Sequence, residues 1–221
     1  NRQRQVEDGA PAERTLNIPN GIDLPRMEKV RAARSEEIPQ TACLIGRVVP
    51  IKDVKTFLRA MRTLVNEIPD AKGWIAGPED EDKEYAAECR SLVTSLGLEK
   101  NVEFLGFQKI DELLPKVGVV VLSSISEALP LVLLEGFAAG VPAVSTDVGS
   151  CRQLIEGLDE DDRAFGTAGS VVGIADPEAL GKAVANLLSN PQAWHEAQQA
   201  GIRRVETLYT QQQMFGSYRE L

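Results

Sequence analysis

Cysteine, histidine and long apolar runs are all scarce in this sequence. Of its 221 residues, three are cysteine, at Cys43, Cys89 and Cys151, and one is histidine. Because the cysteines are odd in number and far apart, they form neither a metal-binding CxxC pair nor a disulfide framework, and we expect a reducing compartment. The longest apolar stretches, at 117–122 and 128–134, fall short of the roughly 20 residues that span a membrane. We therefore expect a cytoplasmic location, with no signal peptide and no anchor.

Positive charge is in deficit as well. The chain carries 24 Lys and Arg against 33 Asp and Glu, a net charge of −9. Bulk electrostatics would not hold such a chain on nucleic acid or on an anionic membrane, so any anion site must be built locally. The length suits one α/β domain with an appendage. We expect the polar stretch 1–14, which lacks a first methionine, to be a cut end, residues 1–40 to be a lead-in or interdomain linker, and residues 41–221 to be the folded domain.

Short apolar runs alternate with segments of helical period from residue 41 onward, as in βα units around a parallel sheet. Phe57, Met61 and Leu64, for example, share one face of a predicted helix. The unbroken apolar run 117–122 suits a central strand that is covered on both faces. The sequence thus predicts an α/β fold, a Rossmann-like six-stranded parallel sheet with helices on both faces. The expected strands are 41–46, 72–76, 102–105, 117–122, 142–145 and 170–173, and the expected helices are 53–67, 84–96, 131–139, 151–155, 176–188 and much of 191–221.

The segment after the first strand, GRVVPIK at 46–52, lacks the motifs of the common nucleotide folds. It contains neither GxGxxG nor GxxxxGK[ST], which removes the main support for hydride transfer and for ATP hydrolysis. It does offer Gly46 at the strand tip and two cations, Arg47 and Lys52, which could grip one diphosphate from two sides. On spacing alone, the alternative is that both cations are solvated surface charges.

Two carboxylates, Glu127 and Glu135, follow the fourth strand. Pro130 suits the first turn of a helix, whose free N–H groups from about Leu131 onward would face the crevice at the carboxyl ends of the strands and favour an anion. Glu135 lies one turn inside that helix between apolar neighbours. If it is buried, it needs a hydroxylated ligand or a cation from elsewhere. An exposed helical glutamate is the alternative.

Seven short motifs follow one another along the chain: NGID at 20–23, GR at 46–47 with Lys52, AG at 76–77, FLG at 104–106, SE at 126–127, the E-x7-E spacing from Glu127 to Glu135, and AGVP at 139–142. In this order they resemble the motifs of the retaining glycosyltransferases of family four, which have the two-Rossmann-domain (GT-B) fold. Within that family, the segment 124–157 is most similar to the cytosolic glycosyltransferases of the Pel exopolysaccharide system. The resemblance implies one half of a GT-B fold, the C-terminal, nucleotide-sugar-binding half, with the N-terminal half missing.

The resemblance also implies roles for individual residues. Arg47 and Lys52 match the pair that binds the donor diphosphate and stabilises it as it leaves. Glu127 matches the carboxylate near the transferred sugar, which makes these three the implied catalytic residues, and Glu135 matches the carboxylate that binds the ribose hydroxyls. Further donor contacts are implied for Gly46, for Gly106 and Phe107 beside the base, and for the backbone of Ala128, Leu129, Pro130 and Leu131. Where the family often has a glycine pair shortly after Glu127, this chain has Ala128, Leu129 and Pro130.

No metal and no other cofactor is expected. Cations aimed at the leaving diphosphate stabilise the transition state more than the ground state, and each is worth roughly 10²- to 10³-fold in rate. The acidic runs 79–82 and 159–162 are the candidate metal ligands, and we interpret both as solvated loops. We also expect His195 on the surface, Cys43 and Phe137 in the core, and Cys151 near the crevice.

The leading hypothesis is a donor-binding domain of a retaining glycosyltransferase that transfers a sugar, glucose by the resemblance, from a UDP-sugar to a growing exopolysaccharide. Alone, this fragment would be inactive. The implied partners are the UDP-sugar, the missing N-terminal domain, a polysaccharide acceptor and membrane-embedded export proteins of the same pathway, with no nucleic acid. Two alternatives stay open: a non-catalytic module that binds a nucleotide or small molecule in the same crevice, and a UDP-sugar epimerase on the same fold.

Overall fold

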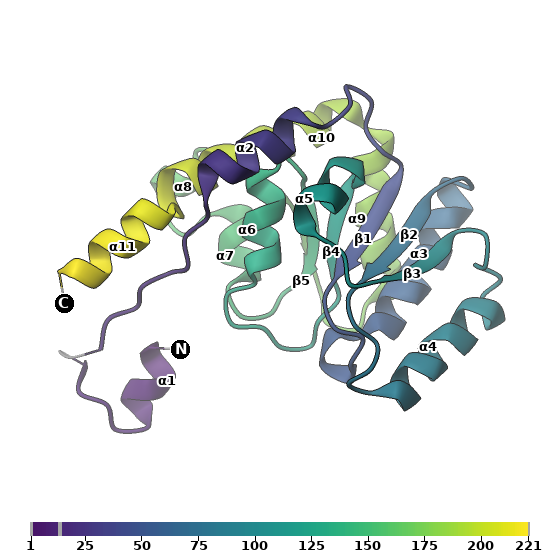
Figure 1. Cartoon of the computed structure of the whole chain (residues 1–221), viewed down its shortest axis with the longest axis horizontal. Helices are drawn as coiled ribbons and strands as arrows, with labels where there is room; N and C mark the ends of the chain where they lie inside the picture. The colour runs from purple at the N-terminus through teal and green to yellow at the C-terminus, as the bar shows by residue number, and fades with distance from the viewer. Residues whose placement is uncertain (1, 13–14, 221) are drawn as a thin grey trace.

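The centre of the molecule is a six-stranded, all-parallel sheet with the order β3-β2-β1-β4-β5-β6. The computed structural model describes residues 2–12 and 15–220, so that two positions of the expected cut end, 13 and 14, and both terminal residues lie outside the described residues. The predicted Rossmann-like α/β fold is confirmed (Figure 1). The strands are β1 (Thr41–Ile45), β2 (Lys72–Ala76), β3 (Val102–Gly106), β4 (Val119–Leu122), β5 (Ala143–Thr146) and β6 (Gly169–Val172).

Helices connect the strands and cover both faces of the sheet, with α3 and α4 to one side and α6 and α7 to the other (Figure 1). The fourth strand begins two residues later than expected, because the Val117 N–H bonds the Leu114 carbonyl and closes a 3-10 turn. The helices are α1 (Arg2–Glu7), α2 (Leu24–Ala32), α3 (Val54–Glu67), α4 (Lys83–Ser95), α5 (Ile110–Leu113), α6 (Leu131–Ala138), α7 (Cys151–Glu156), α8 (Glu160–Arg163), α9 (Pro177–Ser189), α10 (Pro191–Leu208) and α11 (Gln211–Arg219), with 3-10 turns η2 (Pro50–Lys52) and η3 (Leu114–Lys116).

The two faces of the sheet carry two separate hydrophobic cores. Alternate residues of β4 divide between them: Val119 and Val121 pack with α3, α4 and α9, whereas Val120 and Leu122 pack with α2, α6 and α7. Successive side chains of a strand point to opposite faces, so a strand that is covered on both faces must be apolar throughout. The unbroken apolar run in the sequence follows directly from this central position.

Aspartate side chains cap several of the helices that follow strands. Asp53 caps α3 by accepting a hydrogen bond from the Thr56 N–H, and Asp82 caps α4 in the same way from Tyr85. Such caps satisfy N–H groups that have no partner inside the helix. The last residue of the acidic run 79–82, Asp82, is therefore a helix cap.

The region before the first strand contains structure that the sequence analysis did not expect. Residues 2–7 form a short helix, and α2 packs onto the domain with Met27 and Val30 buried in the same core as α6. Ile22 forms a parallel bridge with Thr210, where the chain passes from α10 to α11. The segment before β1 and the segment after α10 thus run side by side.

A buried ion pair ties α8 to α10 and corrects one interpretation made from the sequence. Asp162 belongs to the acidic run 159–162, which we interpreted as a solvated loop, yet its side chain is only 2% exposed. Its Oδ1 accepts a hydrogen bond from Nε of Arg204 at 2.5 Å, and the Arg204 side chain is fully buried. Arg204 also donates to the carbonyls of Ile155, Asp162 and Gly166. The partner lies 42 residues away in sequence, so no local charge pattern could reveal it.

We expect Arg204→Met to lower the free energy of unfolding by about 3–5 kcal/mol, because it leaves the Asp162 carboxylate buried without its cation. Urea unfolding followed by circular dichroism measures this change. The control is Lys182→Met, which removes the exposed pair with Glu178 and should leave the unfolding midpoint unchanged. Equal stability of Arg204→Met and Lys182→Met would show that the buried pair does not hold α8 and α10 together.

Candidate functional site

The strand order places the predicted site at the carboxyl edge of the sheet, where β1 and β4 lie next to each other. From β1 the chain proceeds outward to β2, and from β4 it proceeds outward to β5, so the loops after β1 and β4 diverge at the point where ligands bind in doubly wound folds. Two hydrogen bonds join these loops at their bases: the Ile125 N–H donates to the Ile51 carbonyl at 3.0 Å, and the Ser123 hydroxyl donates to the Lys52 carbonyl at 2.9 Å.

Lys52, in the loop after β1, and Glu127, in the loop after β4, form an ion pair. Both were predicted as site residues. Nζ of Lys52 lies 2.5 Å from Oε1 of Glu127, and the two side chains are only 23% and 12% exposed. The Ser124 hydroxyl donates to the same Glu127 oxygen at 2.7 Å. The methylene stem of Lys52 runs beside Gly46, the glycine at the tip of β1. Both charges were predicted at the site from the sequence, whereas Ser124, which belongs to no motif, was not.

Arg47 has a different partner. Its Nη1 lies 2.6 Å from both carboxylate oxygens of Glu81, in the loop after β2, and both side chains are about half exposed. An exposed pair of this kind contributes about 0–1 kcal/mol, so another anion can replace Glu81 at low cost. Among the described residues, Arg47 and Lys52 donate to different carboxylates and share no acceptor. That the two cations grip one diphosphate stays a prediction.

Glu135 lies in α6, where its side chain is half-buried and, in the described part of the chain, has no hydrogen-bond or ion-pair partner. Burial raises its pKa; the positive charge of Arg26 opposes this rise and the negative charge of Asp111 adds to it. Arg26, from α2, is itself paired with Asp111 at 2.5 Å. The Glu135 carboxylate is therefore partly desolvated and free to accept hydrogen bonds from a ligand. Arg26 and Asp111 lie outside every motif, so neither could be predicted from the sequence pattern.

The first turn of α6 offers backbone donors near the Lys52–Glu127 pair. Pro130 is the residue that precedes the helix, and the Leu133 N–H bonds its carbonyl. Within residues 15–220, the N–H groups of Leu131 and Val132 have no acceptor. Free N–H groups at a helix N-terminus favour an anion, both by hydrogen bonding and through the helix dipole.

Of the remaining predicted donor contacts, some lie farther from the Lys52–Glu127 pair and others make contacts within the protein. Gly106 ends β3, and Phe107 after it is 80% exposed, at the same sheet edge but two strands away from β1. Leu129 packs partly into the core of α6, and the Ala128 carbonyl accepts a hydrogen bond from the Ser150 N–H. In the described part of the chain Lys52 and Glu127 pair with each other and with Ser124, and the place of Phe107 beside a base stays a prediction.

The other residues singled out from the sequence lie largely where we expected. His195 is exposed, and Cys43 and Phe137 are buried in the core. Cys151 follows the turn after β5 but is fully buried, and its pKa is raised, chiefly by burial and to a smaller extent by the charge of Glu127. All three cysteines are free thiols.

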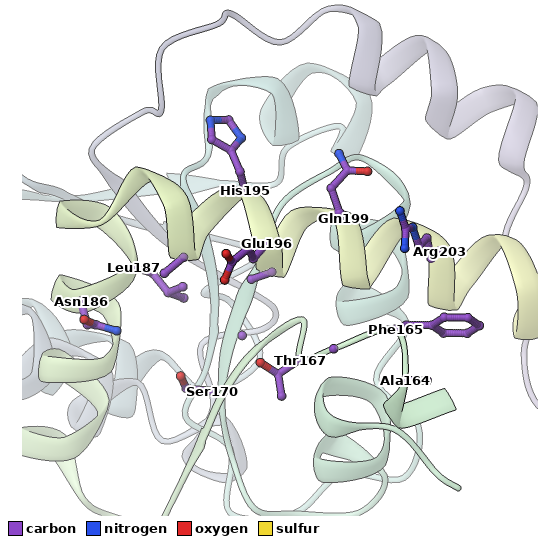
Figure 2. Close-up of a pocket in the computed structure, with 14 residues that line it drawn as sticks. Ala164, Phe165, Thr167, Ser170, Asn186, Leu187, His195, Glu196, Gln199 and Arg203 are labelled. Carbon is purple, nitrogen blue, oxygen red and sulfur yellow. The ribbon is translucent and has the colours of Figure 1, made fainter. Parts of the chain in front are cut away.

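A cavity of about 810 Å³ lies away from the loops after β1 and β4, between α10 and the segment that leads into β6. Figure 2 shows side chains from both walls, among them Thr167, Glu196 and Arg203. It opens beside Gly169, the first residue of β6, and so at the opposite edge of the sheet from the predicted site. None of the predicted site residues lines it.

Residues 2–12 and 15–220 contain no group of three or more His, Cys, Asp or Glu side chains placed to hold a metal ion. Over the same residues, every helix is too short or too polar to cross a membrane.

Comparison with solved structures bears out the fold. HepE of Anabaena, crystallised with UDP and glucose, superposes with a TM-score of 0.82 at 20% identity, over 100% of this chain and 61% of that chain. The C-terminal domain of a glycosyl transferase group 1 family protein from Francisella tularensis superposes with a TM-score of 0.67 at 20% identity, over 88% of this chain and 97% of that domain.

Sequence comparison identifies the family. An exopolysaccharide phosphotransferase of Streptomyces coelicolor is 35% identical over 187 residues, which are 82% of this chain and 18% of that protein. This chain therefore spans only part of the relatives that it matches. The family model described as "Glycosyl transferases group 1" matches residues 26–204. The chain belongs to the group 1 glycosyltransferase family.

Proposed function

We propose that this chain is the donor-binding domain of a retaining glycosyltransferase that transfers glucose from the UDP-sugar UDP-glucose to a growing exopolysaccharide. The observation that carries the proposal is the half-buried Lys52–Glu127 pair at the point where the strand order reverses. A cation and a carboxylate at that point suit a ligand with a charged diphosphate and a hydroxylated sugar. HepE, which has the same fold, was crystallised with UDP and glucose and with UDP-glucose, which supports this choice of donor.

The positive charges of the site act on the leaving group. Breaking the bond between the sugar C1 and the diphosphate oxygen leaves negative charge on the diphosphate, which Lys52 and the free N–H groups of α6 stabilise as it forms. Arg47 adds a second cation once the diphosphate displaces Glu81. In this proposal no metal ion is needed, because three sources of positive potential already face the leaving group.

The carboxylates of Glu135 and Glu127 bind two different parts of the donor, the ribose and the transferred sugar. Glu135 accepts hydrogen bonds from the ribose hydroxyls, and these bonds replace the solvation that burial has removed. Glu127 accepts hydrogen bonds from the transferred sugar. Because Ser124 holds Glu127 independently of Lys52, Lys52 can turn to the diphosphate while the carboxylate stays in place.

The acceptor half of the reaction lies outside this chain. We propose that a second Rossmann domain supplies the acceptor site, and that this chain alone binds the donor without transferring sugar, because transfer requires closure over the crevice. We propose a cytoplasmic reaction, in keeping with the three free thiols, in a pathway such as the Pel system, with membrane-embedded exporters as partners. Product analysis after fusion to the native N-terminal half separates transfer from epimerisation and from binding without chemistry.

We expect Arg47→Ala to weaken UDP binding roughly 10- to 100-fold, the value of a charge-assisted hydrogen bond, while uridine affinity stays nearly unchanged, because uridine has no phosphate. Isothermal titration calorimetry with both ligands measures the difference. Arg90→Ala is the matched control, since Arg90 is equally exposed and pairs with Glu79, two residues from the partner of Arg47. An equal loss for UDP and uridine, or an equal effect of Arg90→Ala, would refute the diphosphate role.

We expect the wild-type chain to prefer UDP over 2′,3′-dideoxy-UDP, and Glu135→Ala to abolish this preference, because the carboxylate binds the ribose hydroxyls. Burial raises the pKa of Glu135, so acidification should reduce the preference at a higher pH than for a fully exposed glutamate. Competition calorimetry at several pH values tests both statements. Glu112→Ala, which removes an exposed carboxylate paired with Lys109, is the control. Equal wild-type affinity for the two nucleotides would exclude the ribose role.

A further inference from the structure

The turn between β5 and α7 lies unusually close to the backbone that carries Glu127. Gly149, in this turn, has a φ of +54°, a conformation that favours glycine. A Cβ on Gly149 would overlap the Glu127 carbonyl oxygen and lie 2.6 Å from the Ala128 carbonyl oxygen. Both neighbours are backbone atoms, so no side-chain rotation could relieve the overlap. Only glycine allows the turn to approach the loop this closely.

Two hydrogen bonds, one from the end of β5 and one from the β5–α7 turn, hold the backbone of the Glu127 loop. The Ser150 N–H donates to the Ala128 carbonyl at 2.9 Å, and the Thr146 hydroxyl donates to the Ser124 carbonyl at 2.6 Å. Glu127 lies between these two anchors, and Ser124 also holds its carboxylate. The position of the Glu127 carboxylate therefore depends on the β5–α7 turn as well as on its own loop.

We propose that Gly149 is a positioning residue of the donor site: by letting the β5–α7 turn close onto the Glu127–Ala128 backbone, it sets where the Glu127 carboxylate meets the transferred sugar. Gly149 touches no substrate in this account and acts through Glu127. The effect on sugar recognition rests on the proposed function, whereas the effect on the loop itself does not.

The chain offers a matched control for the substitution. Gly97 has a φ of +65°, close to that of Gly149, but a Cβ there would meet no atom within 4 Å. Gly97→Ala and Gly149→Ala thus share the cost of placing alanine in a left-handed conformation. Only Gly149→Ala also pushes on the Glu127 loop, so the difference between the two variants isolates that push.

The first measurement compares UDP-glucose with UDP by calorimetry. We expect Gly149→Ala to weaken UDP-glucose binding roughly 10-fold, the value of one lost hydrogen bond to a charged group, with a much smaller change for UDP. Gly97→Ala should leave the ratio of the two affinities unchanged. An equal loss for both ligands in Gly149→Ala, or no loss relative to Gly97→Ala, would overturn the proposal.

The second measurement needs no ligand. Hydrogen–deuterium exchange should become faster across residues 123–131 in Gly149→Ala but not in Gly97→Ala, and unchanged exchange there would also overturn the proposal. If neither the wild type nor any variant binds UDP-glucose, the proposed function fails. The hydrogen–deuterium exchange rates still decide whether Gly149 positions the loop. Should Gly149→Ala not fold, Thr146→Val, which removes the other anchor at similar volume, should produce the same faster exchange, and its absence would count against the proposal.

Discussion

The ion pair between Lys52 and Glu127 joins the two loops that leave the sheet where its strand order reverses, and the rest of the candidate site is arranged around this pair. The parallel sheet brings the carboxyl ends of β1 and β4 together. Hydrogen bonds at the bases of the two loops hold the loops next to each other. The Glu127 loop then leads into α6, which carries the free N–H groups and Glu135. Charges of both signs meet at one edge of the sheet because of the order in which the strands are connected.

Charges that hold the frame differ physically from charges that serve the site. Arg204 and Asp162 are fully desolvated and saturated by each other and by backbone carbonyls, so neither can exchange partners without a large loss of stability. Arg47 and Glu81 are half exposed, so their pair forms and breaks at little cost. Lys52 and Glu127 lie between these limits. Under the proposed function, stability and ligand binding thus rest on separate groups of charges.

Most of the fold could be predicted because parallel strands buried on both faces are apolar throughout, and because the helices repeat their apolar residues at a period of 3.6. Local patterns failed where the partner was distant. Asp162 looked like part of a solvated run because Arg204 lies 42 residues away. The sequence predicted that Lys52 and Glu127 share one edge, but not the contributions of Ser124 or Gly149, whose roles depend on contacts between loops. Helix α2 was missed because only Met27 and Val30 are buried on it.

The central claim is that the loops after β1 and β4 bind UDP, and nuclear magnetic resonance titration of the isotope-labelled chain tests it most directly. Amide signals should shift on addition of UDP at residues 46–52 and 127–135, with the same affinity in the presence of EDTA. The cavity between α10 and β6 should show no shifts. Shifts confined to that cavity, no shifts at all, or a requirement for a divalent metal would contradict the account.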